Sequence, residues 1–256
     1  MCRILGYLGE AIPLEWLLYQ PEHSLVHQSY QPQEMTAGLL NADGFGVGWY
    51  RAEEVFCYRS VMPIWNDANL PDISRYVASD GIIASIRSAT AGSQVSLSNC
   101  PPFRYQQTLM VHNGAVTNFQ ETLLTPLRDR LSPQFARRIQ GSTDSEYLFA
   151  LILQLESEGA TLDRALAEAI ALLLSLGQQH SVEVSANVLI HRGNQLVACR
   201  AGNKSPEPTL YWLQGDDNLP GVVVASEPLW DGKWQPLPEH TLITVEGDRL
   251  VQLQSL

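Results

Sequence analysis

Cys2 is the first residue whose type and position could carry chemistry. Methionine aminopeptidase removes an initiator methionine that precedes a small residue, so loss of Met1 would leave a thiol and a free α-amine together on Cys2. An α-amine has a pKa of about 8, so near neutral pH much of it can take the thiol proton, directly or through a water. One residue then supplies both the nucleophile and its base. Taken alone, a cysteine at position 2 is more often accidental.

A second candidate feature is the pair Asn113-Gly114, which follows His112 at the end of an apolar run, residues 109–112. The Asn113 side-chain amide and the Gly114 N–H could both point at a developing oxyanion. Each such donor can contribute about 3 kcal/mol in the transition state. The alternative is a plain tight turn, which the Asn-Gly pair favours.

Arg87 leaves another apolar run, residues 81–86, and is followed closely by Thr90. A lone arginine in this position is costly unless it is paired. Its fork-shaped guanidinium suits a substrate α-carboxylate. A structural ion pair with Asp or Glu explains Arg87 equally well.

A helix predicted over residues 144–156 begins with several polar residues. Ser142 or Thr143 is placed to cap it, and Glu146 to complete a capping box. Capping explains most of this segment, but Asp144 could also hold a substrate ammonium.

The elements that must position these residues follow from short apolar runs and helical periodicity. We predict strands at residues 4–8, 46–49, 81–86, 109–112, 184–190, 195–199, 209–212, 221–225 and 241–245. We predict helices at residues 13–19, 73–78, 118–127, 144–156 and 161–176. Glycines 44, 46 and 48 lack the spacing and the following helix of a phosphate loop, so we interpret them as a turn entering a strand that another backbone or a ligand approaches closely. The order of elements suits stacked sheets with helices outside, in one domain over residues 1–256.

Composition narrows the class of protein. The 256 residues include 16 Lys and Arg against 27 Asp and Glu, a formal charge of −11, so nucleic acid is an unfavourable partner. No window reaches the apolar length of a membrane span, and the first residues lack the apolar core of a signal peptide. The four cysteines form no C-x-x-C pair, so we expect no metal site and no disulfide framework. We expect a cytoplasmic protein, and the sequence leaves homo-oligomer formation open.

Taken together and in this order, the motifs resemble the glutaminase domain of class II glutamine amidotransferases. More narrowly, they resemble the stand-alone amidohydrolases of ergothioneine biosynthesis. The segments that carry the narrower resemblance are residues 1–3, 5–7, 23–25, 41–50, 63–65, 87–90, 102–103, 112–116 and 225–229. The wider class usually has histidine where this chain has Ser85 and Ala91, and often Thr-His-Pro-Phe where this chain has residues 100–103. Both departures agree with the narrower group.

The resemblance implies an α+β fold of the four-layer αββα sandwich type, and roles for particular residues. Cys2 matches the nucleophile, Asn113 and Gly114 the oxyanion hole, Arg87 the α-carboxylate ligand and Asp144 the α-ammonium ligand. Thr90 and His112 lie in the matching segments, and we expect them to contact the substrate. No metal or organic cofactor is implied.

The implied reaction is hydrolysis of a small-molecule γ-glutamyl amide through a γ-glutamyl thioester. The substrate of the narrower group is γ-glutamyl-hercynylcysteine S-oxide. Three alternatives stay open: a glutaminase subunit that passes ammonia to a separate synthetase, a general γ-glutamyl peptidase acting on glutathione-like compounds, and an inactive sandwich that only binds a partner.

The leaving half of that substrate carries a trimethylammonium group, which cannot donate a conventional N–H hydrogen bond and is suited to aromatic faces. We therefore expect one of four tryptophans, Trp65 foremost, to face the mouth of the Cys2 pocket; the others are Trp49, Trp230 and Trp234. An acidic neighbour such as Asp43 or Glu227 could complete the cation site.

Overall fold

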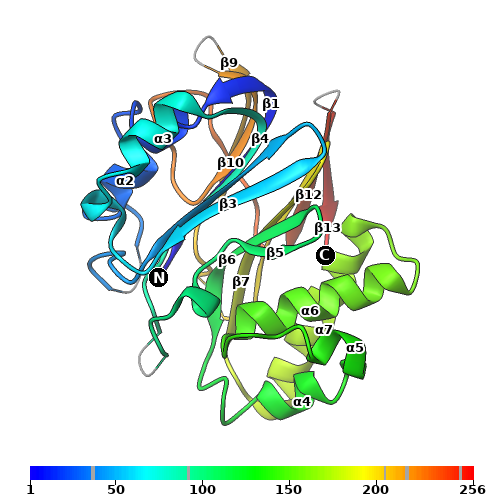
Figure 1. Cartoon of the computed structure of the whole chain (residues 1–256). Coiled ribbons are helices and arrows are strands. Elements are labelled where there is room, and N and C mark those ends of the chain that lie inside the picture. The colour runs from blue at the N-terminus through cyan, green and yellow to red at the C-terminus, as the bar shows by residue number, and fades with distance from the viewer. Residues whose placement is uncertain (36–37, 91–92, 205, 217–218, 248–249) are drawn as a thin grey trace.

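The strands form two antiparallel sheets in the part of the chain that the computed structural model describes, which is residues 1–256 without 36–37, 91–92, 205, 217–218 and 248–249 (Figure 1). The strand order is β11-β9-β10-β1-β4-β2-β3 in the first sheet and β13-β12-β8-β7-β6-β5 in the second. The strands are β1 (Arg3–Pro13), β2 (Phe45–Arg51), β3 (Glu54–Ser60), β4 (Ala78–Ile86), β5 (Phe103–Tyr105), β6 (Thr108–Val116), β7 (Val184–Arg192), β8 (Gln195–Gly202), β9 (Tyr211–Asp216), β10 (Leu219–Ala225), β11 (Gln235–Pro236), β12 (Thr241–Glu246) and β13 (Val251–Ser255). The helices are α1 (Glu15–Leu18), α2 (Leu25–Gln28), α3 (Leu70–Tyr76), α4 (Leu124–Arg128), α5 (Pro133–Ala136), α6 (Asp144–Ser157) and α7 (Leu162–His180), with 3₁₀ turns η1 (Ile64–Asn66) and η2 (Leu97–Asn99).

Two hydrophobic clusters occupy the two faces of the first sheet. On its outer face, Leu17, Leu25 and Leu70 of the short helices α1 to α3 pack against the sheet. On its inner face, Ile4 of β1 and Val111 of β6 belong to one cluster that joins the two sheets. Because successive strand residues point to opposite faces, each strand contributes alternately to the two clusters.

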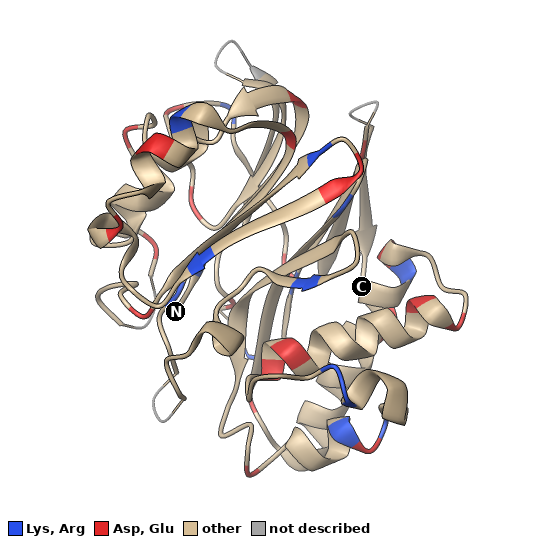
Figure 2. Cartoon of the chain, in the orientation of Figure 1, with Lys and Arg blue, Asp and Glu red and all other residues tan. Residues whose placement is uncertain are grey.

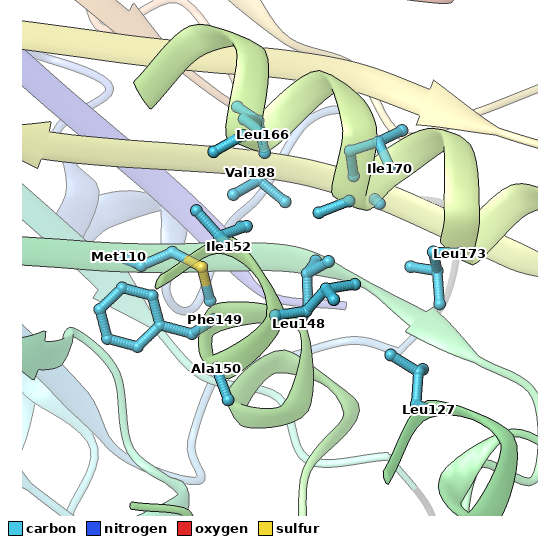
Figure 3. Close-up of a cluster of buried hydrophobic side chains, with 14 of the residues drawn as sticks. Met110, Leu127, Leu148, Phe149, Ala150, Ile152, Leu166, Ile170, Leu173 and Val188 are labelled. Carbon is cyan, nitrogen blue, oxygen red and sulfur yellow. The ribbon is translucent and has the colours of Figure 1, made fainter. Parts of the chain in front are cut away.

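The long helices α6 and α7 cover the outer face of the second sheet (Figure 1). Figure 3 shows Leu148 and Ile152 of α6, Leu166 and Ile170 of α7 and Met110 of β6 in one buried cluster. The layers are therefore helix, sheet, sheet and helix, which confirms the predicted αββα sandwich.

The sequence explains where α7 lies and ends. Its buried residues include Leu162, Ala165, Leu166 and Ala169, a spacing of three and four that forms one apolar face. The helix ends at Ser181, whose left-handed conformation, with φ of 55°, stops the chain from continuing as a helix.

The predicted capping of α6 is half confirmed. Thr143 Oγ1 accepts a hydrogen bond from the Glu146 N–H, as expected of an N-cap. The Glu146 carboxylate does not complete a capping box with Thr143; it accepts from the N–H groups of Gln140, at 2.7 Å, and Gly141, at 2.6 Å. Glu146 therefore stabilises the loop before the helix.

The glycine-rich segment enters β2 as predicted. Gly44 has a φ of 111°, a conformation that favours glycine. A Cβ on Gly46 would lie 2.1 Å from the Pro101 carbonyl oxygen, and a Cβ on Gly48 would lie 2.6 Å from Leu109 Cδ1 in the second sheet. The glycines therefore let another backbone and the opposite sheet approach closely.

Several predicted boundaries are wrong. The apolar run 109–112 continues as a strand to Val116, because β7 pairs with β6 along its whole length. The helix predicted over 118–127 forms only as α4, after a series of turns. Asn118 itself has a φ of 51°, which a right-handed helix cannot accommodate. Among the described residues, the four strands that sequence analysis did not predict, β3, β5, β11 and β13, are those at the sheet edges.

The charged side chains form no dominant basic region in the described residues. Figure 2 shows Lys and Arg scattered along the chain among more numerous Asp and Glu residues. Within the described residues, no helix combines the length and the apolar character that a bilayer crossing requires.

Candidate active site

The alternation of side chains places Cys2 and Arg87 on the same face of the first sheet. Ile4 of β1 and Ile83 of β4 belong to the cluster between the sheets. Cys2, just before β1, is two residues from Ile4, and Arg87, just after β4, is four residues from Ile83, so each shares the face of its neighbour. The two strands are neighbours, with Arg3 opposite Ile86 in the register, so Cys2 lies beside Arg87 at the end of the strand pair. Both side chains therefore start from the inner face of this sheet.

The second sheet presents Asn113 to the same inner layer. Leu109 and Val111 of β6 belong to the cluster between the sheets, and Asn113 is the next residue in that alternation. Sequence analysis ended the predicted strand at His112 and gave a tight turn at Asn113 as the alternative interpretation; the structure places Asn113 within β6, opposite Asn187 of β7. A strand holds this side chain more rigidly than a turn does.

A cavity of about 1010 Å³ opens at this end of the sandwich. Six residues that the sequence singled out line it: Cys2, Arg87, Thr90, His112, Gly114 and Asp144. They come from both sheets and from the start of α6, so only the folded chain brings them together.

Cys2 is half-buried, and its Sγ lies 3.7 Å from the Ser88 carbonyl oxygen. Burial is the largest influence on the nearby terminal amine of Met1 and lowers its pKa, and Arg3 acts in the same direction; the Cys2 thiol and the Asp43 carboxylate oppose them. Met1 also lines the cavity. Removal of Met1 would transfer the terminal amine to Cys2 in surroundings that favour its neutral, basic form.

Arg87 is buried but has no carboxylate partner among the described residues. Its guanidinium donates to Ser93 Oγ at 3.1 Å and to the carbonyl oxygens of Gln94 at 3.3 Å and Asp43 at 3.4 Å. The side chain is 4% exposed. The structural ion pair considered as an alternative is therefore not formed, and the cavity contains a buried cation that an anionic ligand group would neutralise.

Asn113 is fully buried, yet neither its Nδ2 nor its Oδ1 has a hydrogen-bond partner among the described protein residues. An unsatisfied buried amide costs stability, so its presence calls for an explanation. Gly114 is required by the packing, because a Cβ there would lie 2.0 Å from the Ser185 carbonyl oxygen. This pair is therefore a strand segment with an unused amide donor beside the cavity, and not the tight turn of the alternative interpretation.

His112 and Asp144 form a polar group on the other side of β6. His112 Nδ1 lies 2.8 Å from Ser145 Oγ, while Asp144 accepts the N–H groups of Val116 and Ser145, both at 2.8 Å. Burial lowers the pKa of His112, and the Asp144 charge opposes this only in part. A neutral His112 thus orients the start of α6.

Four predicted site residues lie outside the lining of the cavity: Asn113, whose neighbours His112 and Gly114 do line it, and Asp43, Trp65 and Glu227. Asp43 Oδ2 accepts the Ala89 N–H at 2.7 Å and so holds the loop that follows Arg87. Trp65 is 38% exposed and contacts the edge of Tyr30. Glu227 is buried in an ion pair with Arg3.

Described residues that the sequence did not single out also line the cavity. They include the rings of Phe103 and Phe119 and the exposed carboxylate of Glu121, while no tryptophan is among the described lining residues. Ser145 could have been found, since it follows Asp144 directly. The others carry no local signal, because in sequence a residue that lines a cavity looks like one at an ordinary core or surface position. Ala91, one of the departures noted above, lies outside the described residues.

Residues 20–207 match a family model described as glutamine amidotransferases class-II. The chain is 32% identical to a gamma-glutamyl-hercynylcysteine sulfoxide hydrolase of Mycobacterium tuberculosis, over 96% of this chain and 93% of that protein. A protein of the same name from Mycolicibacterium smegmatis is also 32% identical, over 98% of each chain. A probable glutamine amidotransferase of Saccharomyces cerevisiae is 28% identical, over 98% of this chain and 83% of its own length.

Solved structures are similar over the whole chain. A glutamine aminotransferase class-II domain protein from Silicibacter pomeroyi has a TM-score of 0.74 and 27% identity and covers 99% of both chains. A glutamine phosphoribosylpyrophosphate amidotransferase of Bacillus subtilis has a TM-score of 0.70 at 19% identity, over 99% of this chain and 49% of that one. The second likeness concerns the fold alone.

Proposed function

The chain belongs to the class II glutamine amidotransferases, and from this premise we propose that it hydrolyses a γ-glutamyl amide through a thioester on Cys2. One observation carries the proposal. A buried guanidinium without a carboxylate partner among the described residues, Arg87, shares a cavity with the thiol of Cys2. The amide of Asn113, unpaired within the described part of the chain, lies between two residues of β6 that line the same cavity, His112 and Gly114.

The proposed reaction begins when Met1 has been removed. The α-amine of Cys2 takes the thiol proton as the sulfur attacks the γ-carbonyl carbon, and the Asn113 amide and the Gly114 N–H stabilise the oxyanion. The oxyanion collapses, the C–N bond breaks, and the departing amine receives the proton held by the α-ammonium. Water then attacks the thioester with the α-amine as base, releasing glutamate and restoring the thiol.

The glutamyl half would bind through complementary charges. Arg87 can donate two parallel hydrogen bonds to the α-carboxylate, and Asp144 can accept from the α-ammonium. Thr90 and His112 line the same cavity. In this proposal the two ends of the glutamyl zwitterion bind to groups of opposite charge in the cavity.

The leaving group that we propose is hercynylcysteine sulfoxide. Two relatives of that hydrolase name align over nearly their whole length. The cavity of about 1010 Å³ lies at the top of the range of about 300–1,000 Å³ for sites that enclose a drug-sized ligand, so it has room for far more than ammonia. Phe103, Phe119 and Glu121 offer aromatic and anionic groups to the trimethylammonium.

A hydrolysis panel tests the proposal. Glutamate release would be measured with the γ-glutamyl sulfoxide, glutamine and glutathione, using Cys2→Ala as the blank. We expect the sulfoxide to have the highest kcat/KM by at least about tenfold, which corresponds to about 1.4 kcal/mol. Equal values for glutamine would favour the ammonia-supplying glutaminase, and equal values for glutathione would favour a general γ-glutamyl peptidase.

A further inference from the structure

A buried ion pair lies directly behind the proposed nucleophile. Arg3 is 0% exposed and Glu227 is 1% exposed, and Arg3 Nε lies 2.6 Å from Glu227 Oε1. Arg3 projects from the face of β1 opposite to Cys2, the face that packs against α1 to α3. Burying two charges is costly even when they are paired, and an apolar pair of similar volume is often at least as stable.

The cost is higher because Arg3 is not fully satisfied. Its Nη2 is buried without a hydrogen-bond partner among the described residues. A buried charged donor without a partner costs stability. The pair therefore calls for an explanation in terms of the adjacent site.

Each member of the pair holds a different part of that site. Arg3 Nη1 donates to the Cys2 carbonyl oxygen at 3.0 Å. The Glu227 carboxylate accepts the N–H groups of Gln33, at 2.9 Å, and Glu34, at 3.1 Å, in the segment that leads toward Gly38 in the cavity wall. The pair thus connects the nucleophile's own backbone to the loop beside it.

We propose that Arg3 and Glu227 are positioning residues that orient Cys2 for attack by holding its carbonyl group. This inference rests on the proposed role of Cys2 as the nucleophile. Once Met1 is gone, no preceding peptide restrains Cys2, and the contact of its thiol with the Ser88 carbonyl is long, at 3.7 Å. The hydrogen bond from Arg3 fixes the plane of the Cys2–Arg3 peptide, and with it the position of the Cys2 Cα from which the α-amine and the thiol project.

Charge keeps this arrangement in place over the working range of pH. Burial raises the pKa of the Glu227 carboxyl, but the hydrogen bond from His23 and the charge of Arg3, with two backbone N–H groups, outweigh it and lower the pKa to about 2. His23 Nε2 lies 2.6 Å from Glu227 Oε2. The carboxylate thus stays ionised at neutral pH and holds Arg3 toward the Cys2 carbonyl.

The test compares Glu227→Gln with Arg3→Lys. Glu227→Gln keeps the shape but removes the charge that holds the guanidinium. Arg3→Lys keeps a cation for Glu227, but its single nitrogen cannot contact the carboxylate and the Cys2 carbonyl in the same geometry. Readouts are kcat, KM, and the rate at which iodoacetamide alkylates Cys2, followed on the N-terminal peptide by mass spectrometry.

Both variants are expected to lower kcat by about tenfold to a hundredfold with little change in KM, the range expected when a reacting group is misplaced. They should also change the rate of Cys2 alkylation. Glu156→Gln, which breaks the ion pair with Arg192 in the other half of the sandwich, is the matched control and should leave both readouts unchanged.

Folded Arg3→Lys protein with wild-type kcat and alkylation rate would overturn the inference, whatever the fate of Glu227→Gln. The inference would also be overturned if the activity lost by each variant equals its unfolded fraction, as measured by urea unfolding. Wild-type activity in Cys2→Ala, by contrast, would refute the proposed function itself.

Discussion

Replacing Asn113 by leucine should make the protein more stable and much less active. Asn113 is fully buried beside Val111 in the layer between the sheets, and both polar atoms of its amide lack a partner among the described residues. An unsatisfied buried polar group costs about 1–3 kcal/mol, and leucine has nearly the same shape without that cost. We expect Asn113→Leu to raise the free energy of unfolding by about 1–3 kcal/mol.

The same change should reduce turnover. Loss of one oxyanion donor costs about 3–4 kcal/mol in the transition state, which lowers kcat by about a hundredfold to a thousandfold. KM should change little, because the oxyanion exists only after attack. The Gly114 N–H remains, so we expect residual activity.

Urea unfolding and steady-state kinetics test this prediction, with Asn187→Leu as the control. Asn187 lies opposite Asn113 and is equally buried, but its Nδ2 donates to the carbonyl oxygens of Pro208 at 2.9 Å and Thr209 at 3.0 Å. Its replacement should destabilise the fold by about 1–3 kcal/mol and leave kcat per folded molecule unchanged. If Asn113→Leu is destabilised to the same degree and keeps its kcat, Asn113 is structural and the oxyanion assignment fails.

Four further predictions concern the removal of Met1, the binding of the glutamyl carboxylate, the recognition of the leaving group and the stability at low pH. Active protein should have a mass lacking Met1, and Cys2→Ala should be folded but inactive; full activity in a sample that retains Met1 would refute the base assigned to the α-amine. Arg87→Lys should lose the bidentate contact and lower kcat/KM by at least about tenfold, or about 1.4 kcal/mol, and a smaller effect would argue against a carboxylate ligand. Glu121→Gln should weaken the binding of the sulfoxide substrate by about fivefold, or about 1 kcal/mol, without altering glutamine hydrolysis. Equal effects on both substrates would show that Glu121 does not recognise the cation. Because the folded pKa of Glu227 is lowered to about 2, its contribution to stability is present above its ordinary pKa and is lost as pH falls toward the folded value. Between about pH 5 and about pH 3, the free energy of unfolding in urea should therefore fall by about 2 kcal/mol more for the wild type than for Glu227→Gln. Equal losses in the two proteins would contradict the lowered pKa.

Sequence patterns predicted the elements that bury a complete apolar face. The spacing along α7 and the apolar runs of β1, β4, β6 and β7 identify central elements, because burial on one or both faces selects apolar residues at every buried position. The strands that were not predicted lie at the sheet edges, where burial is weaker. Four of the five residues of β13, for example, are exposed.

The sequence also determined which groups could react. A thiol beside the chain terminus, a cap at Thr143 and a glycine that tolerates close approach are properties of residue type and of neighbours within a few positions. These local facts made Cys2, Arg87 and Asn113 candidates, and the family resemblance of the ordered motifs gave each its expected role.

Only the tertiary structure decided which groups surround each candidate. Asn113 and Gly114 look locally like a turn, but pairing with β7 makes them a strand, and the amide of Asn113 has no partner among the described residues. Arg87 likewise has no carboxylate partner in the described part of the chain, while the acidic candidate Glu227 pairs with Arg3, 224 residues away in sequence. Partners so distant leave no mark on local periodicity, because contact, burial and charge compensation are fixed only when the two sheets come together.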